Sequence, residues 1–487
     1  MPPVGYTDEA VQTAIGLQSE LSDQTRFNTR RWLGLIGGPI VLVVLWFAPT
    51  HESPAAQHAV AIAALMIVLW ATEALDHALS GLIGVLLFWA LGVSSFKAAF
   101  SGVANNTTWF LFGAILIGGA ASTSGLARRI ACTIAARIGT SYSRLLLAFT
   151  MIDFFLTFLI PSGIARVTIL SAIAAGTVRG LGMAPRSNVG RGLLIIVTYS
   201  ATLFDKMILA GASSILARGI LEEIGHVHVY YSQWFLAYLP GDIVTIVCCW
   251  GVVLWLYPPE REQLEDTTKY FVGELARLGP YSASEKKCAV LLTAAVVLWM
   301  TDLIHRLNPA TVGLAVGLLA LFPKVGILRI RDLRQLNFRV IGFTAAALGM
   351  SRVLVDTKGL EVLTNVMMAW MKPLVTGPFT ASIVLYWTAF AYHIFLANPP
   401  AMLSTSLPVV LRFASAQGLH PLPIGMIWTF GAGGKIFAYQ SAVLIVGYSY
   451  GYFDGKDLLK VGLILTLVES LVLLALVSFY WPFIGIS

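Results

Sequence analysis

Long apolar segments alternate with short polar segments along almost the whole chain. Apolar runs of about eighteen residues occur, for example, at Trp32–Pro49 and Leu463–Trp481. A helix of that length spans the ~30 Å hydrocarbon core of a lipid bilayer. The pattern therefore predicts an all-α, polytopic membrane protein.

Two kinds of membrane segment are expected from this pattern. Continuous helices are predicted at about residues 32–49, 58–73, 78–93, 107–126, 233–257, 288–306, 310–323 and 461–483, with two more segments within 340–372. Pro and Gly interrupt four other apolar stretches at mid-depth. We interpret 145–178 and 378–414 as re-entrant helical hairpins, and 192–224 and 424–447 as broken membrane crossings.

The interruptions occupy corresponding places in the two halves of the chain. The hairpins are interrupted at Phe158–Gly163 and Phe395–Pro400, and the crossings at Leu209–Ser214 and between Gly431 and Ser441. Pro and Gly are common in membrane helices, so one break alone means little. Paired breaks are typical of transporters with two inverted repeats, whose substrate site lies at the bilayer midplane. The predicted repeats are residues 32–257 and 288–487.

The charged residues are few and unevenly distributed. They make up 12% of the 487 residues, against about a quarter in soluble proteins. Residues 258–287 alone hold eleven, and residues 1–31 hold seven. This composition excludes an ordinary soluble enzyme, a disordered chain and a nucleic-acid-binding domain. Basic loops are expected on the cytoplasmic side, which predicts a cytoplasmic N-terminal arm at 1–31 and a cytoplasmic linker at 258–287.

Several short motifs resemble one transporter family along the full length. They are Asn106–Gly113, Ser124–Arg129, Phe271–Gly279, Glu285–Lys287 and Gly447–Tyr452. The chain resembles the divalent anion:sodium symporter family, in the branch of the citrate/succinate antiporters and the 2-oxoglutarate/malate translocators. The resemblance implies a homodimer in which a transport domain slides as an elevator against a fixed scaffold. It also places the last helix, which carries Glu469, in the scaffold.

The hairpin tips depart from the pattern of that family. Family members carry a Ser-Asn-Thr motif at each tip, which holds substrate carboxylates and helps to bind sodium. Here the first tip has Ser162, Gly163 and Ile164, and the second has Pro400, Ala401 and Met402 or begins one residue earlier. In neither register does the second tip offer a hydroxyl or an amide. We therefore expect no cofactor, and sodium only in the alternative interpretation given below.

Candidate site residues cluster around the four breaks. The predicted substrate-binding residues are Ser162, Gly163, Ile164, Arg166, Ser213, Ser214, Asn398, Pro400, Ala401, Met402, Tyr439 and Gln440, and the predicted charge-coupling residues are Lys435, Lys206 and Asp205. A charge at mid-membrane usually faces a cavity or a partner. Structural alternatives stay open for some of these residues. Arg166 could pair with Asp153 inside the hairpin, and Asp205 or Lys206 could form a structural ion pair within the helix bundle. His393 could be a core residue whose hydrogen bonds are satisfied.

The function predicted from these features is secondary active transport of small organic anions across the bacterial inner membrane. Sodium-independent exchange or proton coupling is expected, with Lys435 replacing a sodium ion. A sodium-coupled dicarboxylate symporter is the alternative. An anion channel fits less well, as does an intramembrane hydrolase that uses Gly211–Ser214 and His393. The predicted partners are the anion, the bilayer and a second copy of the chain.

Overall fold

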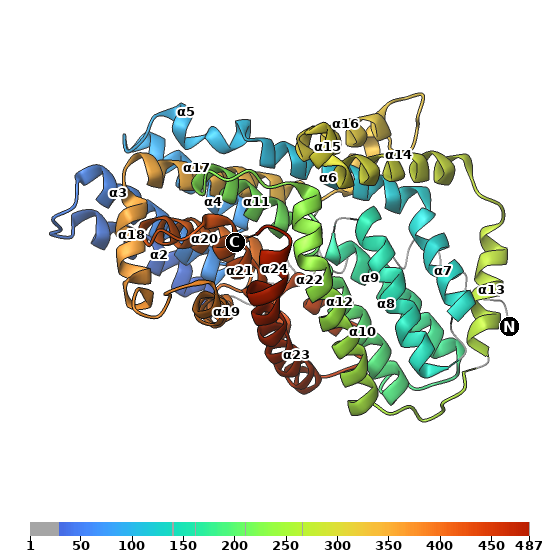
Figure 1. The fold of residues 1–487 in the computed structure, drawn as a ribbon. Helices are drawn as coiled ribbons and strands as arrows, with labels where there is room; N and C mark the ends of the chain where they lie inside the picture. Colours follow the sequence, from blue (N-terminus) through green and yellow to red (C-terminus); the bar gives the residue numbers. More distant parts are fainter. Residues whose placement is uncertain (1–28, 139–140, 161, 210, 265, 487) are drawn as a thin grey trace.

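The computed structural model describes residues 29–138, 141–160, 162–209, 211–264 and 266–486. Every regular element among these residues is a helix, as predicted (Figure 1). Most of the predicted N-terminal arm, residues 1–28, lies outside the described part. So does Pro161 at the first hairpin tip.

The first half of the chain forms eleven of the α-helices in the described residues. They are α2 (Thr29–Phe47), α3 (Pro54–Thr72), α4 (His77–Ala90), α5 (Phe96–Ala99), α6 (Asn106–Ser124), α7 (Leu126–Ile138), α8 (Tyr142–Leu159), α9 (Gly163–Gly180), α10 (Asn188–Leu203), α11 (Ala212–Ile224) and α12 (Tyr231–Leu256). The two helices of the first predicted hairpin are α8 and α9. The first broken crossing consists of α10 and α11.

The second half follows with twelve more. They are α13 (Asp266–Leu278), α14 (Ala283–Met300), α15 (Asp302–His305), α16 (Pro309–Leu321), α17 (Arg339–Asp356), α18 (Gly359–Met368), α19 (Pro378–Phe395), α20 (Pro399–Ala416), α21 (Pro421–Gly431), α22 (Ala442–Ser449), α23 (Gly455–Ala475) and α24 (Trp481–Phe483). The second hairpin is α19 and α20, and the second broken crossing is α21 and α22.

Six helices among the described residues are long and apolar enough to cross a membrane, or seven if the bent pair α17–α18 counts as one span. The peripheral helix α2 shows the expected lipid-facing surface, since Val44 and Phe47 are 60% and 77% exposed although both are strongly apolar. Such exposure is costly in water and favourable against lipid chains. The protein is therefore a multi-pass membrane protein.

The two hairpins have matching neighbours. Helices α8 and α9 pack on α10, and α19 and α20 pack on α21. Helix α9 also packs on α22, while α20 packs on α11. Each hairpin thus contacts the first part of its own broken crossing and the last part of the other one. Figure 1 shows α8 and α9 towards one end of the molecule, α18 to α20 towards the other, and α12 and α23 between them.

Three boundaries differ from the sequence predictions. The basic segment after α6 was expected to be a loop, but its spacing of apolar residues forms the amphipathic helix α7. The predicted linker 258–287 contains the whole of α13 and the first turn of α14. The last helix was expected from about residue 461 and begins at Gly455; it packs on α12, α19 and α21.

Three of the motifs that carry the family resemblance contact one another, and a fourth contacts α9. Arg129 donates to Glu285 through Nε (2.6 Å) and to the carbonyl of Gly279 through Nη1 (2.9 Å). These hydrogen bonds lower the pKa of Glu285, so the ion pair persists at neutral pH. At the other end of the sequence, Tyr450 and Tyr452 in the segment after α22 donate to carbonyls of α9. The motifs thus form hydrogen bonds between helices, and these contacts do not involve the residues of the two breaks.

Candidate functional site

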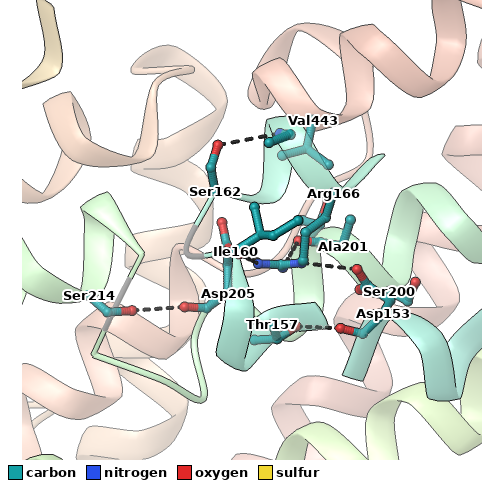
Figure 2. Close-up of polar contacts among 12 residues, drawn as sticks. Asp153, Thr157, Ile160, Ser162, Arg166, Ser200, Ala201, Asp205, Ser214 and Val443 are labelled. Atoms are coloured by element: carbon teal, nitrogen blue, oxygen red, sulfur yellow. Dashed lines mark hydrogen bonds and ion pairs between the residues drawn. The ribbon is translucent and has the colours of Figure 1, made fainter. Parts of the chain in front are cut away.

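Arg166 joins the first hairpin to the first broken crossing. It is fully buried one turn into α9. Its Nε donates to Asp153 of α8 (2.9 Å) and its Nη1 to the carbonyl of Ile160 (3.0 Å). Its Nη2 donates to the carbonyl of Ala201 (2.8 Å) and to Asp205 (3.1 Å). The expected Arg166–Asp153 link is therefore present, and Figure 2 shows the guanidinium surrounded by these acceptors.

The tip of the first hairpin touches both breaks. A Cβ on Gly163 would lie 2.9 Å from the Ala201 carbonyl and from Asp205, both at the first break. It would also lie 3.0 Å from Val443, which follows the second break. Only a residue without a side chain fits this approach. The neighbouring Ser162 is exposed and accepts from the Ala165 N–H (3.3 Å), which makes it the N-cap of α9.

Asn398 is the counterpart of Ser162 at the second hairpin tip. It is the N-cap of α20 and accepts from the Ala401 N–H at 3.2 Å. The two sequence alignments, which matched Ser162 with Pro400 or with Pro399, are therefore wrong. The second tip does offer a side-chain amide, that of Asn398. Pro400 lies in the first turn of α20, where Ala401 and Met402 are buried. Ile164 has the corresponding place in α9.

The first break is shifted relative to the sequence prediction. Helix α10 ends at Leu203 and α11 begins at Ala212, so Ser213 and Ser214 lie in the first turn of α11 rather than in the break. Ser214 is buried and donates to the carbonyl of Asp205 (2.9 Å) (Figure 2). Ser213 is partly exposed. The break is therefore occupied by Asp205 and Lys206.

The second break lies between Gly431 and Ser441, as predicted. Gln440 is buried, and its Oε1 accepts from the N–H groups of Ile436 (2.8 Å) and Phe437 (2.9 Å). Its Nε2 has no hydrogen-bond partner in the described part of the chain. Tyr439 is exposed and stacks on Phe437. Gln440 thus holds the loop while keeping two N–H donors available.

Lys435 lies within the second break with its side chain almost buried, at 8% exposure. Its backbone carbonyl accepts from Tyr199 (3.3 Å). Among the described residues, its ammonium has neither a carboxylate within 4 Å nor a hydrogen bond, although the charges of Asp205 and Glu469 act on it. A buried charge without a partner is costly. This is the feature of the site that most requires an explanation.

Lys206 crosses from the first break to the second. Its Nζ lies 4.1 Å from the centre of the Phe430 ring, and a Cβ on Gly433 would come within 2.6 Å of it. It forms a close ion pair with Glu469 of α23 and lies 3.7 Å from Asp242 of α12. The predicted charge-coupling residue Lys206 is thus paired, and Glu469 belongs to the site. Sequence reasoning missed Asp242, although an aspartate inside an apolar run was a usable signal.

His393 is also near the second break and is fully buried. Its Nδ1 lies 3.3 Å from the carbonyl of Gly434, whereas its Nε2 has no partner among the described residues. The expectation of a fully satisfied core histidine therefore holds for one ring nitrogen only. The Ser214 hydroxyl donates to the carbonyl of Asp205 instead of to His393.

A family model described as the sodium:sulfate symporter transmembrane region matches residues 29–487. The chain belongs to this family. The divalent anion:sodium symporter assignment made from the motifs is thereby confirmed. The family consists of transporters, so the protein is a membrane transporter rather than an enzyme.

Three curated relatives illustrate the similarity. The citrate/succinate antiporter of Escherichia coli is 24% identical over 93% of this chain and 97% of its own length. The L-tartrate/succinate antiporter of the same organism is 24% identical over 80% of both chains. A membrane protein of Cupriavidus necator is 24% identical over 94% of this chain and 93% of its own length.

Proposed function

We propose that this protein exchanges small organic anions, of the di- or tricarboxylate type, across the bacterial inner membrane without sodium. The observation that carries the proposal is the buried Lys435 ammonium, which has no partner among the described residues. The relatives named as citrate/succinate and tartrate/succinate antiporters support the substrate class. A carboxylate bound beside Lys435 would neutralise it, and a substrate-free site would leave the charge unpaired. That difference favours exchange over net uptake.

The donors around Lys435 suit an anion. Gln440 keeps its Nε2 donors free, and Nε2 of His393 is likewise unpartnered within the described residues. The exposed Ser162 hydroxyl at the first tip and the partly exposed Ser213 offer further donors. The N-termini of α9 and α11 add partial positive charge. Arg166 contributes to this field, while its hydrogen bonds to protein acceptors give it a mainly structural role.

The same residues fit a sodium ion poorly. Sodium binds several oxygen ligands, and at the second break Lys435 would repel it. The positive charge of Lys206 also acts at the second break and would add to this repulsion. A sodium-coupled dicarboxylate symporter therefore remains only the alternative function, and proton coupling fits the cations better.

An elevator in a homodimer is the mechanism that we propose. The crossed packing of the hairpins, α9 on α22 and α20 on α11, supports a single moving unit made of two inverted repeats. Such a unit would carry Lys435 and the bound anion past a scaffold formed by α2 to α6 and α14 to α18. We further propose that the N-terminus and the segment around α13 face the cytoplasm.

Counterflow in proteoliposomes tests the function. Vesicles loaded with succinate should accumulate labelled succinate, and uptake should persist when choline replaces sodium. Citrate, tartrate and malate should compete, whereas monovalent inorganic anions should not. Strict sodium dependence would favour the symporter, and non-saturating flux without counterflow would favour a channel. Chemical cross-linking in membranes would test the homodimer.

A further inference from the structure

Asp242 is the most unusual buried group in the molecule. It lies at 0% exposure in the middle of α12, inside an otherwise apolar helix. Neither of its carboxylate oxygens has a hydrogen-bond partner among the described residues. The nearest cation is Lys206, whose Nζ is 3.7 Å away, which is beyond hydrogen-bond distance. A fully ionised carboxylate in such a place lacks the hydrogen bonds that usually stabilise it.

Lys206 cannot fully neutralise Asp242 because it already forms an ion pair with a second carboxylate. Its closer ion pair is with Glu469. One lysine and two carboxylates leave this buried group of three residues with one excess negative charge. Two carboxylates that share one cation in a low-dielectric site commonly bind one proton between them.

The surrounding charged and titratable groups lie on α12 itself and on or after three other helices, and they do not remove that excess. Lys435 faces the group from the second break but also receives the fields of Asp205 and of Glu469. Three tyrosines near the group already use their hydroxyls as donors. The groups facing Asp242 and Glu469 include Lys206 after α10, Lys435 after α21, Tyr199 on α10, whose hydroxyl donates to Leu458 (2.9 Å), Tyr238 on α12, whose hydroxyl donates to Met426 (2.8 Å), and Tyr386 on α19, whose hydroxyl donates to Thr466 (2.8 Å) and Glu469 (3.3 Å).

We propose that Asp242, with Glu469 and Lys206, forms a proton-binding site that couples proton movement to anion transport. The proposal rests on the proposed transport function and adds the coupling ion and its site. A proton on the Asp242–Glu469 pair cancels the excess negative charge beside the second break. The break then attracts an anion more strongly, so anion and proton bind together. When the proton leaves, the excess negative charge returns and the anion is released.

A proton fits this place better than a metal cation. Both oxygens of Asp242 lack a hydrogen-bond partner among the described residues. The Lys206 ammonium lies over the ring of Phe430, and Trp234 donates to the Lys206 carbonyl. Sodium needs several oxygen ligands and would sit within reach of the Lys206 ammonium. A proton needs one oxygen and no cavity.

Infrared spectroscopy of the full-length protein tests the site without any substrate. The wild type should show a protonated carboxylic acid band that is lost as the pH is raised. Asp242→Asn should remove it, and so should Glu469→Gln, because one carboxylate then remains for one lysine. Asp457→Asn is the matched control, since both oxygens of Asp457 already accept hydrogen bonds. A band that persists in both triad variants, or that is absent from the wild type, overturns the proposal.

Transport measurements separate this proposal from the proposed function. Fumarate is a suitable probe because it stays a dianion throughout the neutral range. With fumarate counterflow intact, the wild type should take up about one proton per bound anion, and Asp242→Asn about none. Intact counterflow with no proton taken up on fumarate binding to the wild type would overturn the proton site but leave the exchanger in place. Absent counterflow would instead count against the dicarboxylate exchanger, and the infrared titration would still decide on the proton site.

Discussion

Arg166 and Lys435 are both buried cations next to a break, but their surroundings differ. Arg166, behind the first hairpin tip, donates four hydrogen bonds to two carboxylates and two carbonyls. Lys435, within the second break, has no such contact among the described residues. A cation with satisfied donors stabilises the fold, whereas a buried cation without a partner is costly unless a ligand pairs with it. We therefore propose that the first break is the more structural half of the site and the second is the more functional half.

The largest expected effect is on stability, from the Arg166→Gln substitution. The change leaves Asp153 buried without its partner, which typically costs about 3–5 kcal/mol. Thermal unfolding of the purified protein in detergent should show this loss. The control is Arg412→Gln, because the ion pair of Arg412 with Glu361 is about half exposed and should contribute less than about 1 kcal/mol. Equal stability of both variants would contradict the structural role of Arg166.

Lys435→Ala should have the opposite profile. The fold loses no ion pair, so the unfolding temperature should change little. The free energy of anion binding should weaken by about 2–5 kcal/mol. At ordinary anion concentrations this loss abolishes measurable uptake. Lys435→Arg should keep part of the binding because it keeps the charge. Full counterflow in Lys435→Ala would remove the second break from the anion site.

The sequence predicted the architecture well because Pro and Gly mark breaks locally. The second break, for example, lies within one residue of its predicted limits, Gly431 and Ser441. The registers at the tips failed for a local reason as well, since the N-cap geometry that aligns Asn398 with Ser162 is not visible in apolar spacing. The ion pair between Lys206 and Glu469 joins residues 263 positions apart, and single-sequence patterns carry no such information.

Gly163→Ala tests how closely the first tip approaches the two breaks. The added methyl would meet a carbonyl and a carboxylate at 2.9 Å, and the required shift costs about 1–3 kcal/mol. Counterflow should slow several-fold, because the tip can no longer close against the second break. Gly455→Ala is the matched control, since nothing lies within 4 Å of its added Cβ. An unaffected Gly163→Ala would mean that the tip is looser than the contacts indicate.

The smallest expected effects compare the two tips directly. Ser162→Ala and Asn398→Ala each remove an N-cap, and each should cost about 1 kcal/mol of stability. The swaps Ser162→Asn and Asn398→Ser keep a capping side chain, so they should unfold close to the wild-type temperature.

Because a swap preserves the cap but changes the donor that faces the break, a change in anion affinity in these variants reports on substrate contact alone. We expect Ser162→Asn to alter the half-saturating anion concentration more than Asn398→Ser does, since Ser162 is the more exposed of the two and its hairpin tip touches both breaks. Equal affinities in both swaps, with normal stability, would mean that the tips only hold the helices in place.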